Sequence, residues 1–154
     1  MEYKIIEPNS FDESVPGLLI FEIGRMKFCT DLRMITVILK PDEIKQIQSI
    51  DSENTAAVLY NNQEYNIIYF NRLVNLEEIK DIYASRLILL DIYDKKIALL
   101  VDKVTEILSI DKAFIEESIN YNPNSDIEYI NGILKFQNMT CYLPDYKKIT
   151  KGLN

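Results

Sequence analysis

The stretch LILLDIYDKKIALLVDKVTEIL, residues 87–108, decides the fold because an earlier stretch of the same chain repeats it. Residues 18–39, LLIFEIGRMKFCTDLRMITVIL, align with it without a gap at a constant offset of 69 residues. Apolar residues fall opposite apolar ones nearly throughout, lysine meets lysine (Lys27 and Lys96), and threonine meets threonine (Thr36 and Thr105). Such repetition predicts one structural unit used twice.

The composition indicates a globular protein that does not bind nucleic acid. Of the 154 residues, 47% are hydrophobic and 27% charged, which is enough apolar material for one ordinary core or two small cores that support each other. The formal net charge is −7, so no basic surface is expected to neutralise nucleic-acid phosphates or to dock on anionic lipid. Charged residues break every long apolar run, so no membrane insertion is expected.

The residue types available for catalysis are few. Histidine is absent, which removes the commonest general base, the usual zinc ligand and every pairing of a nucleophile with histidine. Cys29 and Cys141 lie far apart in the chain within apolar surroundings, and no signal peptide precedes them. We therefore expect a reduced, cytoplasmic protein in which only carboxylates, Lys, Tyr or Cys could take part in proton transfer.

Around the repeat, alternation and turn residues predict short strands with little helix. Predicted strands cover residues 18–23, 26–39 (one or two strands), 56–60, 65–73, 87–92, 96–108, 129–136 and 139–143. Tight turns are expected at Gly24-Arg25, Asn61-Asn62, Asp94-Lys95 and Gln137-Asn138. Helices or helical turns are expected over residues 41–50, 76–86 and 144–149 and after Asp111, and a loop over residues 120–125.

These elements predict an all-β protein made of two small five-stranded antiparallel barrels. Residues 1–17 are expected to form a polar tail, residues 18–80 the first barrel repeat, and residues 81–150 the second. A barrel of this size buries little apolar surface alone, so the two should share an interface. The sequence leaves open whether each barrel takes all its strands from one repeat or whether the halves exchange a strand.

The chain resembles the family of the chemotaxis coupling protein CheW. The resemblance rests on LLIFEIG near the start, IALLVDKVTEILSI after the midpoint and YINGIL before the last hairpin, and it covers about residues 18–149. Its most specific part is Val101-Asp102-Lys103-Val104 leading into Ile107-Leu108, which is similar to the family's V-D-x-V-x-x-V/I-L run. Gly24 matches the family's first turn glycine.

What the resemblance implies is a non-enzymatic adaptor. Such an adaptor would join the regulatory domain of a CheA-type histidine kinase to the cytoplasmic helical tip of a chemoreceptor. The receptor hairpin would lie in an apolar groove between the barrels, and the barrel ends would contact the kinase. By motif match, Ile35, Val104 and Ile107 fall at groove positions.

The chain departs from the family at two places associated with partner contacts. The family usually carries Asn-Leu-Arg-Gly before a Pro-Ile-Val-Asp-Leu strand, whereas this chain reads Leu59-Tyr60-Asn61-Asn62, so the arginine is missing. A glutamate common in the family's third strand corresponds to Val37. Val37, Asn61 and Asn62 are therefore candidate partner-binding positions at which this chain differs, and a divergent module with another signalling partner is the alternative function.

A third hypothesis is a small-ligand or catalytic barrel. Asp81, Asp91 and Asp102 could form an acid–base pair or a site for a hard cation, but no ligand spacing supports this. Cys29 and Cys141 could be redox-active, but neither lies in a C-x-x-C motif or beside a run of cations, and buried apolar filler is the favoured interpretation.

Overall fold

The structure, a computed structural model, describes residues 17–40, 47–49, 56–74, 76, 84–108, 119–121, 129–136 and 138–151. The expected tail lies outside the described residues except for Gly17, which is buried. The predicted helices over residues 76–86 and after Asp111 fall largely or wholly outside them. The all-β prediction is confirmed.

The strands follow each other through the chain with only two described α-helices, both short. The strands are β1 (Leu18–Ile23), β2 (Met26–Asp31), β3 (Ile35–Leu39), β4 (Ile47–Ser49), β5 (Ala56–Tyr60), β6 (Gln63–Ile68), β7 (Arg86–Ile92), β8 (Lys95–Val101), β9 (Lys103–Leu108), β10 (Ile119–Tyr121), β11 (Ile130–Phe136) and β12 (Met139–Pro144). The helices are the 3-10 helix η1 (Leu32–Met34), α1 (Phe70–Leu73) and α3 (Tyr146–Lys151).

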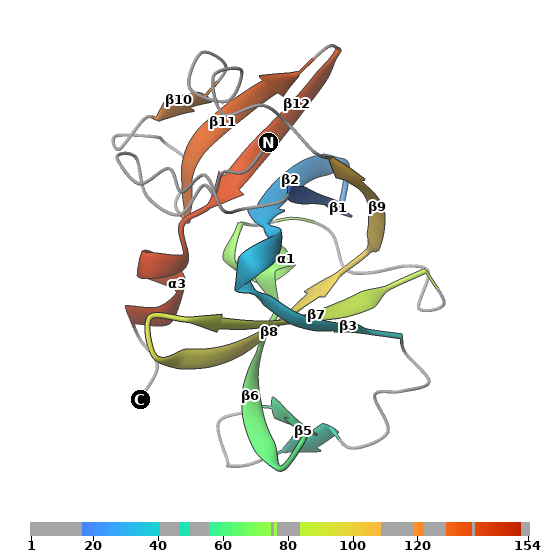
Figure 1. Cartoon of the computed structure of the whole chain (residues 1–154), viewed down its shortest axis with the longest axis vertical. Coiled ribbons are helices and arrows are strands. Elements are labelled where there is room, and N and C mark those ends of the chain that lie inside the picture. The colour runs from blue at the N-terminus through green and yellow to red at the C-terminus, as the bar shows by residue number, and fades with distance from the viewer. Residues whose placement is uncertain are drawn as a thin grey trace.

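These strands form two sheets, and each sheet takes strands from both repeats (Figure 1). One sheet has the order β10-β11-β12-β2-β1-β9, and the other has the order β3-β7-β8-β6-β5-β4. The hairpin β1–β2 of the first repeat thus lies among strands of the second, and the hairpin β7–β8 of the second lies among strands of the first. The two repeats exchange their leading hairpins, which answers the question that the sequence leaves open.

Each sheet contains five strands of at least five residues and one three-residue edge strand, β10 or β4. Its two edge strands do not pair with each other within the described ranges, so barrel closure is partial. The expectation of purely antiparallel sheets is wrong at one pair in each sheet, because β12 runs parallel to β2 and β6 runs parallel to β8. The exchange causes this, since each incoming hairpin meets a strand of the other repeat in the same direction.

The exchanged hairpins are buried on both faces, as the apolar runs predict. In β7, Ile88, Leu90 and Ile92 pack into a core that both sheets line, which we call the shared core. Leu87 and Leu89 point to the other face and pack into a second core, which lies within the sheet that runs from β3 to β4. The alternation follows from the two-residue period of a strand, and it makes each hairpin part of two cores at once.

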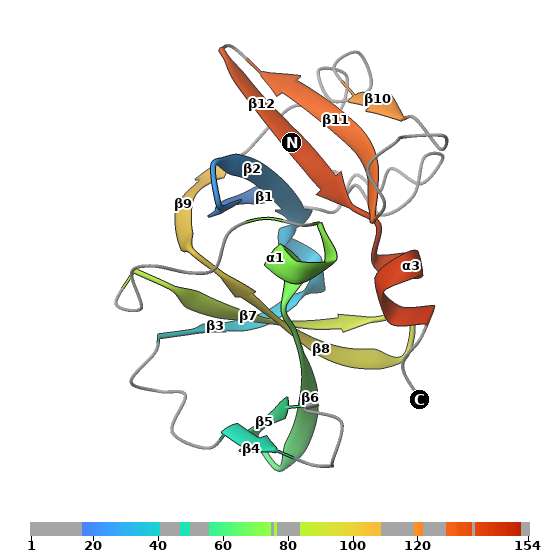
Figure 2. The same cartoon turned by 180° about the vertical axis from the view of Figure 1, so that it is seen from behind.

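Two helices cover the shared core from the ends of the sheets (Figure 2). Phe70 of α1 meets Phe28 of β2 edge to face, with ring centroids 5.2 Å apart. Tyr146 of α3 is buried beside Thr30 of β2, and the two hydroxyl groups share a hydrogen bond. Burial raises the pKa of the Tyr146 phenol, so this contact stays neutral. The predicted helical turn near residues 144–149 is confirmed and extends to Lys151.

Several local predictions are wrong. The part of the predicted helix over residues 41–50 that the structure describes is strand β4. The turn placed at Asp94-Lys95 lies one residue earlier, at Tyr93-Asp94, where both residues have positive φ. The predicted strand over residues 65–73 ends at Ile68 and is followed by helix α1. Residues 120 and 121, where a loop is predicted to begin, belong to β10, and the rest of that predicted loop lies outside the described residues.

Candidate partner-binding surface

Strands β3 and β9 occupy equivalent places in the two repeats, and each contains a β-bulge at the repeated threonine. In the β3–β7 ladder, Ile35 pairs with Leu90 and Val37 with Leu89, so Thr36 is the extra residue. In the β1–β9 ladder, Val104 pairs with Phe21 and Glu106 with Ile20, so Thr105 is the extra residue. An extra residue reverses the face of the sheet to which each of the following side chains points.

The bulge in β9 places two of the predicted groove residues on one face. Val104 and Ile107 are three positions apart, which would put them on opposite faces of a regular strand. Because Thr105 is inserted, Val104 lies opposite Phe21 and Ile107 opposite Leu19, and both of these β1 residues face the shared core. Val104 packs against that core, whereas Ile107 is 62% exposed. The apolar face of β9 therefore continues from the core into solvent.

Strand β3 repeats this arrangement. Ile35 lies opposite Leu90 and Ile38 opposite Ile88, and both isoleucines are half-buried against the shared core. We call the four residues Ile35, Ile38, Val104 and Ile107 the apolar margin. It has one pair from each repeat, both contributed by edge strands. Such a surface is suited to an apolar partner because its side chains are already held by the core beneath them.

The structure does not bring the other three predicted residues to this margin. Val37 lies opposite Leu89 and packs into the core of its own sheet. Asn61 and Asn62 are exposed in the β5–β6 turn, where both have positive φ, as the turn prediction requires. Figures 1 and 2 both place that turn at the bottom of the molecule, away from β9. Any partner contact at these residues belongs to a separate surface.

Asp102 connects the start of β9 to the first hairpin. Its Oδ2 accepts a hydrogen bond from the backbone N–H of Gly24 at 2.7 Å, and its own N–H donates to the carbonyl oxygen of Glu22 at 2.9 Å. Burial raises the pKa of the Asp102 carboxyl, while the Gly24 bond opposes the shift and the charge of Glu22 adds to it. The aspartate of the V-D-x-V run thus anchors the β1–β2 turn.

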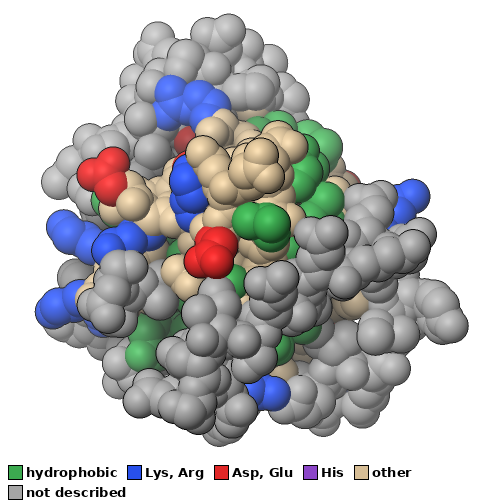
Figure 3. All heavy atoms as spheres, turned by 90° about the horizontal axis from the view of Figure 1, so that it is seen from below, with side chains coloured by type: hydrophobic (Ala, Val, Ile, Leu, Met, Phe, Trp, Pro, Cys, Tyr) green, Lys and Arg blue, Asp and Glu red, His purple; other side chains and the backbone are tan. Residues whose placement is uncertain are grey.

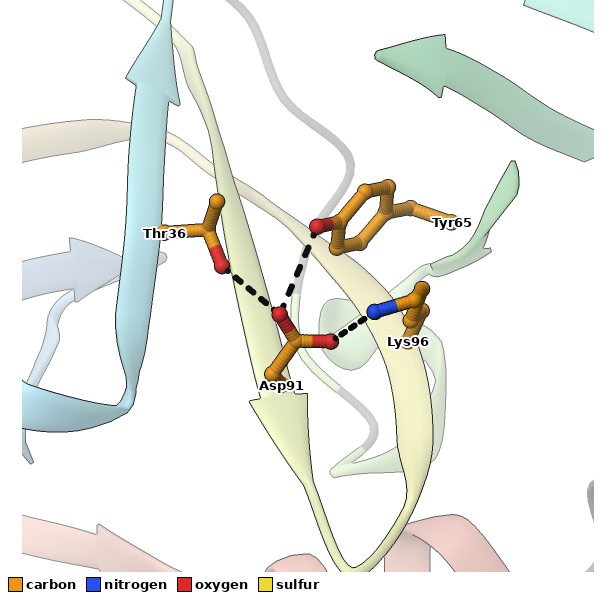
Figure 4. Close-up of polar contacts among 4 residues, drawn as sticks. All are labelled: Thr36, Tyr65, Asp91 and Lys96. Atoms are coloured by element: carbon orange, nitrogen blue, oxygen red, sulfur yellow. Dashed lines mark hydrogen bonds and ion pairs between the residues drawn. The ribbon is translucent and has the colours of Figure 1, made fainter. Parts of the chain in front are cut away.

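A polar cluster around Asp91 supports the β3 bulge (Figure 4). Asp91 Oδ2 accepts a hydrogen bond from Thr36 Oγ1 at 3.1 Å and a long one from the Tyr65 hydroxyl at 3.5 Å. Asp91 Oδ1 accepts from Lys96 Nζ at 2.7 Å, and this hydrogen bond raises the pKa of Lys96. The lysine also lies 5.5 Å from the centre of the Tyr65 ring. Nothing in the sequence indicated this cluster, because its members come from four strands.

In this cluster the lysine and the carboxylate form an ion pair, and the carboxylate in turn holds Thr36 and Tyr65. No group of three or more acidic or cysteine residues that could hold a metal occurs among the described residues. Cys29 and Cys141 are buried and carry free thiols. A hydrogen bond that Cys29 donates to Cys141 lowers the pKa of Cys141 and, together with burial, raises the pKa of Cys29. A buried thiol of high pKa is a poor nucleophile.

On the face shown in Figure 3, the described Lys and Arg side chains lie in several separate groups. No helix within the described part of the chain is long and apolar enough to cross a membrane.

The geometry defines a class of protein: a β-protein of two interlocked repeats, each of which contributes one edge strand to the apolar margin. The model of the CheW-like domain matches residues 17–153, and the chain belongs to this family. Among solved structures it is similar to the scaffolding protein TtCheW from Thermoanaerobacter tengcongensis, with 19% sequence identity, a TM-score of 0.71, and coverage of 84% of this chain and 88% of that one. A search of curated proteins gives no match.

Proposed function

We propose that the chain is a non-catalytic cytoplasmic adaptor of chemotaxis-type signalling. It joins the regulatory domain of a CheA-type histidine kinase to the cytoplasmic helical tip of a chemoreceptor and uses no cofactor. Membership of the CheW-like family supports the adaptor class. The observation that carries the receptor-binding part is the apolar margin, because the bulges present residues of two edge strands on one core-backed face.

In this proposal the receptor helix lies along the apolar margin. A helix in such a groove is recognised through apolar side chains that repeat every three or four residues. Ile107 is the residue best placed to meet it, since 62% of its surface is available for burial. Val104 and Ile35 would form the floor, where they already contact the shared core. The kinase domain would bind at the ends of the sheets, on a different surface.

The test is Ile107→Glu. A buried, unpaired carboxylate at an interface costs several kcal/mol, so binding to a chemoreceptor tip should fall at least roughly tenfold. Binding to a CheA regulatory domain, measured separately, should be unchanged. Ile107 is a sharper probe than Val104, because Val104→Glu would also disturb the shared core.

Leu59→Glu is the matched control. Leu59 is 40% exposed on β5, in a part of the molecule away from β9, and the substitution introduces the same charge. Equal losses in both variants would contradict the margin as the receptor site. If the unmutated protein binds the kinase domain but no receptor tip, the alternative of a divergent module for another partner is favoured, in line with the missing arginine near Asn61.

A further inference from the structure

A surface hollow lies where the parallel strands β2 and β12 begin. Its volume is about 320 Å³. Met26, Met139 and Tyr142 contribute apolar surface to it, and the Tyr142 ring is itself supported by Phe28, with centroids 6.1 Å apart. Arg25, Lys27, Asn138 and Thr140 contribute polar groups. We call the site formed by these seven lining residues the basic hollow.

The basic hollow is cationic in a chain of net charge −7. None of its lining residues is acidic. The nearest carboxylate by register is Glu22, which lies opposite Lys27 in the β1–β2 ladder, and Lys103 already pairs with it at 3.3 Å. Among the described residues neither Arg25 nor Lys27 forms an ion pair. Two cations are therefore available beside an apolar surface.

The other repeat provides an internal comparison. There β6 runs parallel to β8, and Asn66 pairs with Ile97. In the basic hollow's junction, Tyr142 pairs with Phe28, the residue that aligns with Ile97 in the repeat. The two junctions therefore have the same register. Aligned through these pairs and the 69-residue offset, Asp94 takes the place of Arg25, and Glu64 takes the place of Thr140. The other junction thus carries two carboxylates, and its Lys96, in the place of Lys27, is already paired with Asp91, whereas the two cations of the basic hollow are uncompensated. The charge of the basic hollow comes from its own side chains and does not follow from the fold.

We propose that the basic hollow binds an acidic peptide segment of a protein partner, in which a carboxylate lies next to an apolar side chain. The cations would pair with the carboxylate, and the methionines and Tyr142 would receive the apolar group, since thioethers adapt to varied shapes. The hollow is open to solvent and would cover little of a free metabolite. A protruding segment of a protein would also be held by contacts between the rest of that protein and the surface around the hollow. This inference does not depend on the apolar margin or on the adaptor proposal.

The experiment uses the full chain and two blocked hexapeptides, acetyl-Gly-Phe-Glu-Asp-Leu-Gly-amide and its neutral counterpart with Gln-Asn in place of Glu-Asp. Titration followed by amide NMR shifts should move the signals of residues 25–27 and 139–142 with the acidic peptide only. In Arg25→Gln/Lys27→Gln the affinity should fall at least tenfold. Added salt should also weaken binding in the unmutated protein.

Lys95→Gln/Lys148→Gln is the matched control, because it removes two positive charges outside the hollow and should leave the affinity unchanged. A loss equal to that of the hollow variant would reduce the effect to net charge and overturn the proposal. Equal binding of the neutral peptide, or the same shifts from inorganic phosphate at equal concentration, would also overturn it. A circular dichroism spectrum identical to that of the parent confirms that each variant is folded.

Discussion

Asp102 lies in the run of residues that most specifically resembles the family, and its geometry gives that residue a structural task. Its carboxylate binds the turn at Gly24, across a chain separation of 78 residues, and so ties the second repeat to the hairpin of the first. Its other oxygen, Oδ1, is buried without a hydrogen-bond partner among the described residues. The bond that holds the hairpin therefore comes with a desolvated charge.

Asp102→Asn should separate the stabilising hydrogen bond to Gly24 from the cost of the desolvated charge. Burial raises the pKa of Asp102, so the folded chain binds the proton more tightly than the unfolded chain does. The contribution of Asp102 to the free energy of unfolding is then most favourable at low pH and falls as the pH rises from the ordinary aspartate value through the folded value. Asparagine keeps an acceptor for Gly24 without the charge. At pH 7 the variant should be at least as stable as the parent, with the difference shrinking toward pH 4.

Urea denaturation at the two pH values measures this difference. Asp102→Ala is the control, because it removes the acceptor and should cost roughly 1 kcal/mol at pH 4, and less at pH 7, where it also removes the desolvated charge. If Asp102→Asn were as destabilised at pH 7 as the alanine variant, the carboxylate charge itself would be needed.

At this scale the sequence predicts side-chain type better than side-chain direction. The motif match selected Ile35, Val104 and Ile107, but their common face depends on the bulges at Thr36 and Thr105, and threonine is an ordinary strand residue with no bulge signature. The match of the two threonines in the repeat was visible, yet its meaning required the ladders. Val37 looked equivalent to its neighbours by position alone, and the same bulge turns it to the other core.

The hairpins β1–β2 and β7–β8 are the elements that the sequence predicted best, since both strands of each are apolar on both faces. The two hairpins differ in how well their turn residues suit a positive φ. Gly24 has φ +63, which suits glycine, whereas the aligned position in the second hairpin is Tyr93 with φ 50, followed by Asp94 with φ 60. A two-residue hairpin turn with both φ values positive prefers glycine at its second position. The second hairpin therefore carries a strained turn.

Asp94→Gly should relieve that strain. Glycine adopts a left-handed backbone without steric cost, and this gain is partly offset by the greater freedom of glycine in the unfolded chain. We expect a net stabilisation of about 0.5–1 kcal/mol, visible as a rise in Tm in a thermal scan. Asn62→Gly at the β5–β6 turn is the comparison and should give a smaller gain, because asparagine already tolerates that backbone. A lower Tm for Asp94→Gly would show that the aspartate makes a compensating contact.

The predicted element type is wrong over residues 47–49, where a pattern that fits a helix belongs to a strand. Ile44, Ile47 and Ile50 are spaced three apart, and Pro41 with Asp42 resembles a helix start, so the pattern favoured a helix. Ile47 instead begins β4, which pairs with β5 at the edge of its sheet. Tertiary pairing decides such short segments, and three residues are too few to show alternation.

At the scale of the whole molecule, the exchange of hairpins could not be read from the sequence. Both repeats have the same order of elements and similar apolar patterns, so β12 has equal reason to pair with β8 of its own repeat or with β2 of the other. The structure shows the second choice, in the same register as the pairing of β6 with β8. Every sheet is then incomplete without the other repeat, and the shared core draws on both.

Splitting the chain between residues 80 and 81 tests this interdependence. Each fragment alone lacks two central strands of one sheet and the partners of its own hairpin, so neither should show a cooperative thermal transition. Mixing the fragments should restore a one-to-one complex with the circular dichroism spectrum of the intact protein. Cooperative unfolding of residues 1–80 alone would contradict the exchanged topology.

The pairing of β2 with β12 also bears on how the protein is made. Strand β2 ends at Asp31, but the strand that covers its open side is β12, Met139–Pro144, which leaves the ribosome long after it. Until β12 is made, the nascent chain therefore carries an apolar hairpin whose β2 edge is unpaired, a state in which strands readily join other chains. The β1–β2 hairpin thus waits through most of the described chain for its neighbour on the β2 side, so a chaperone that holds nascent chains would help this protein most at that hairpin.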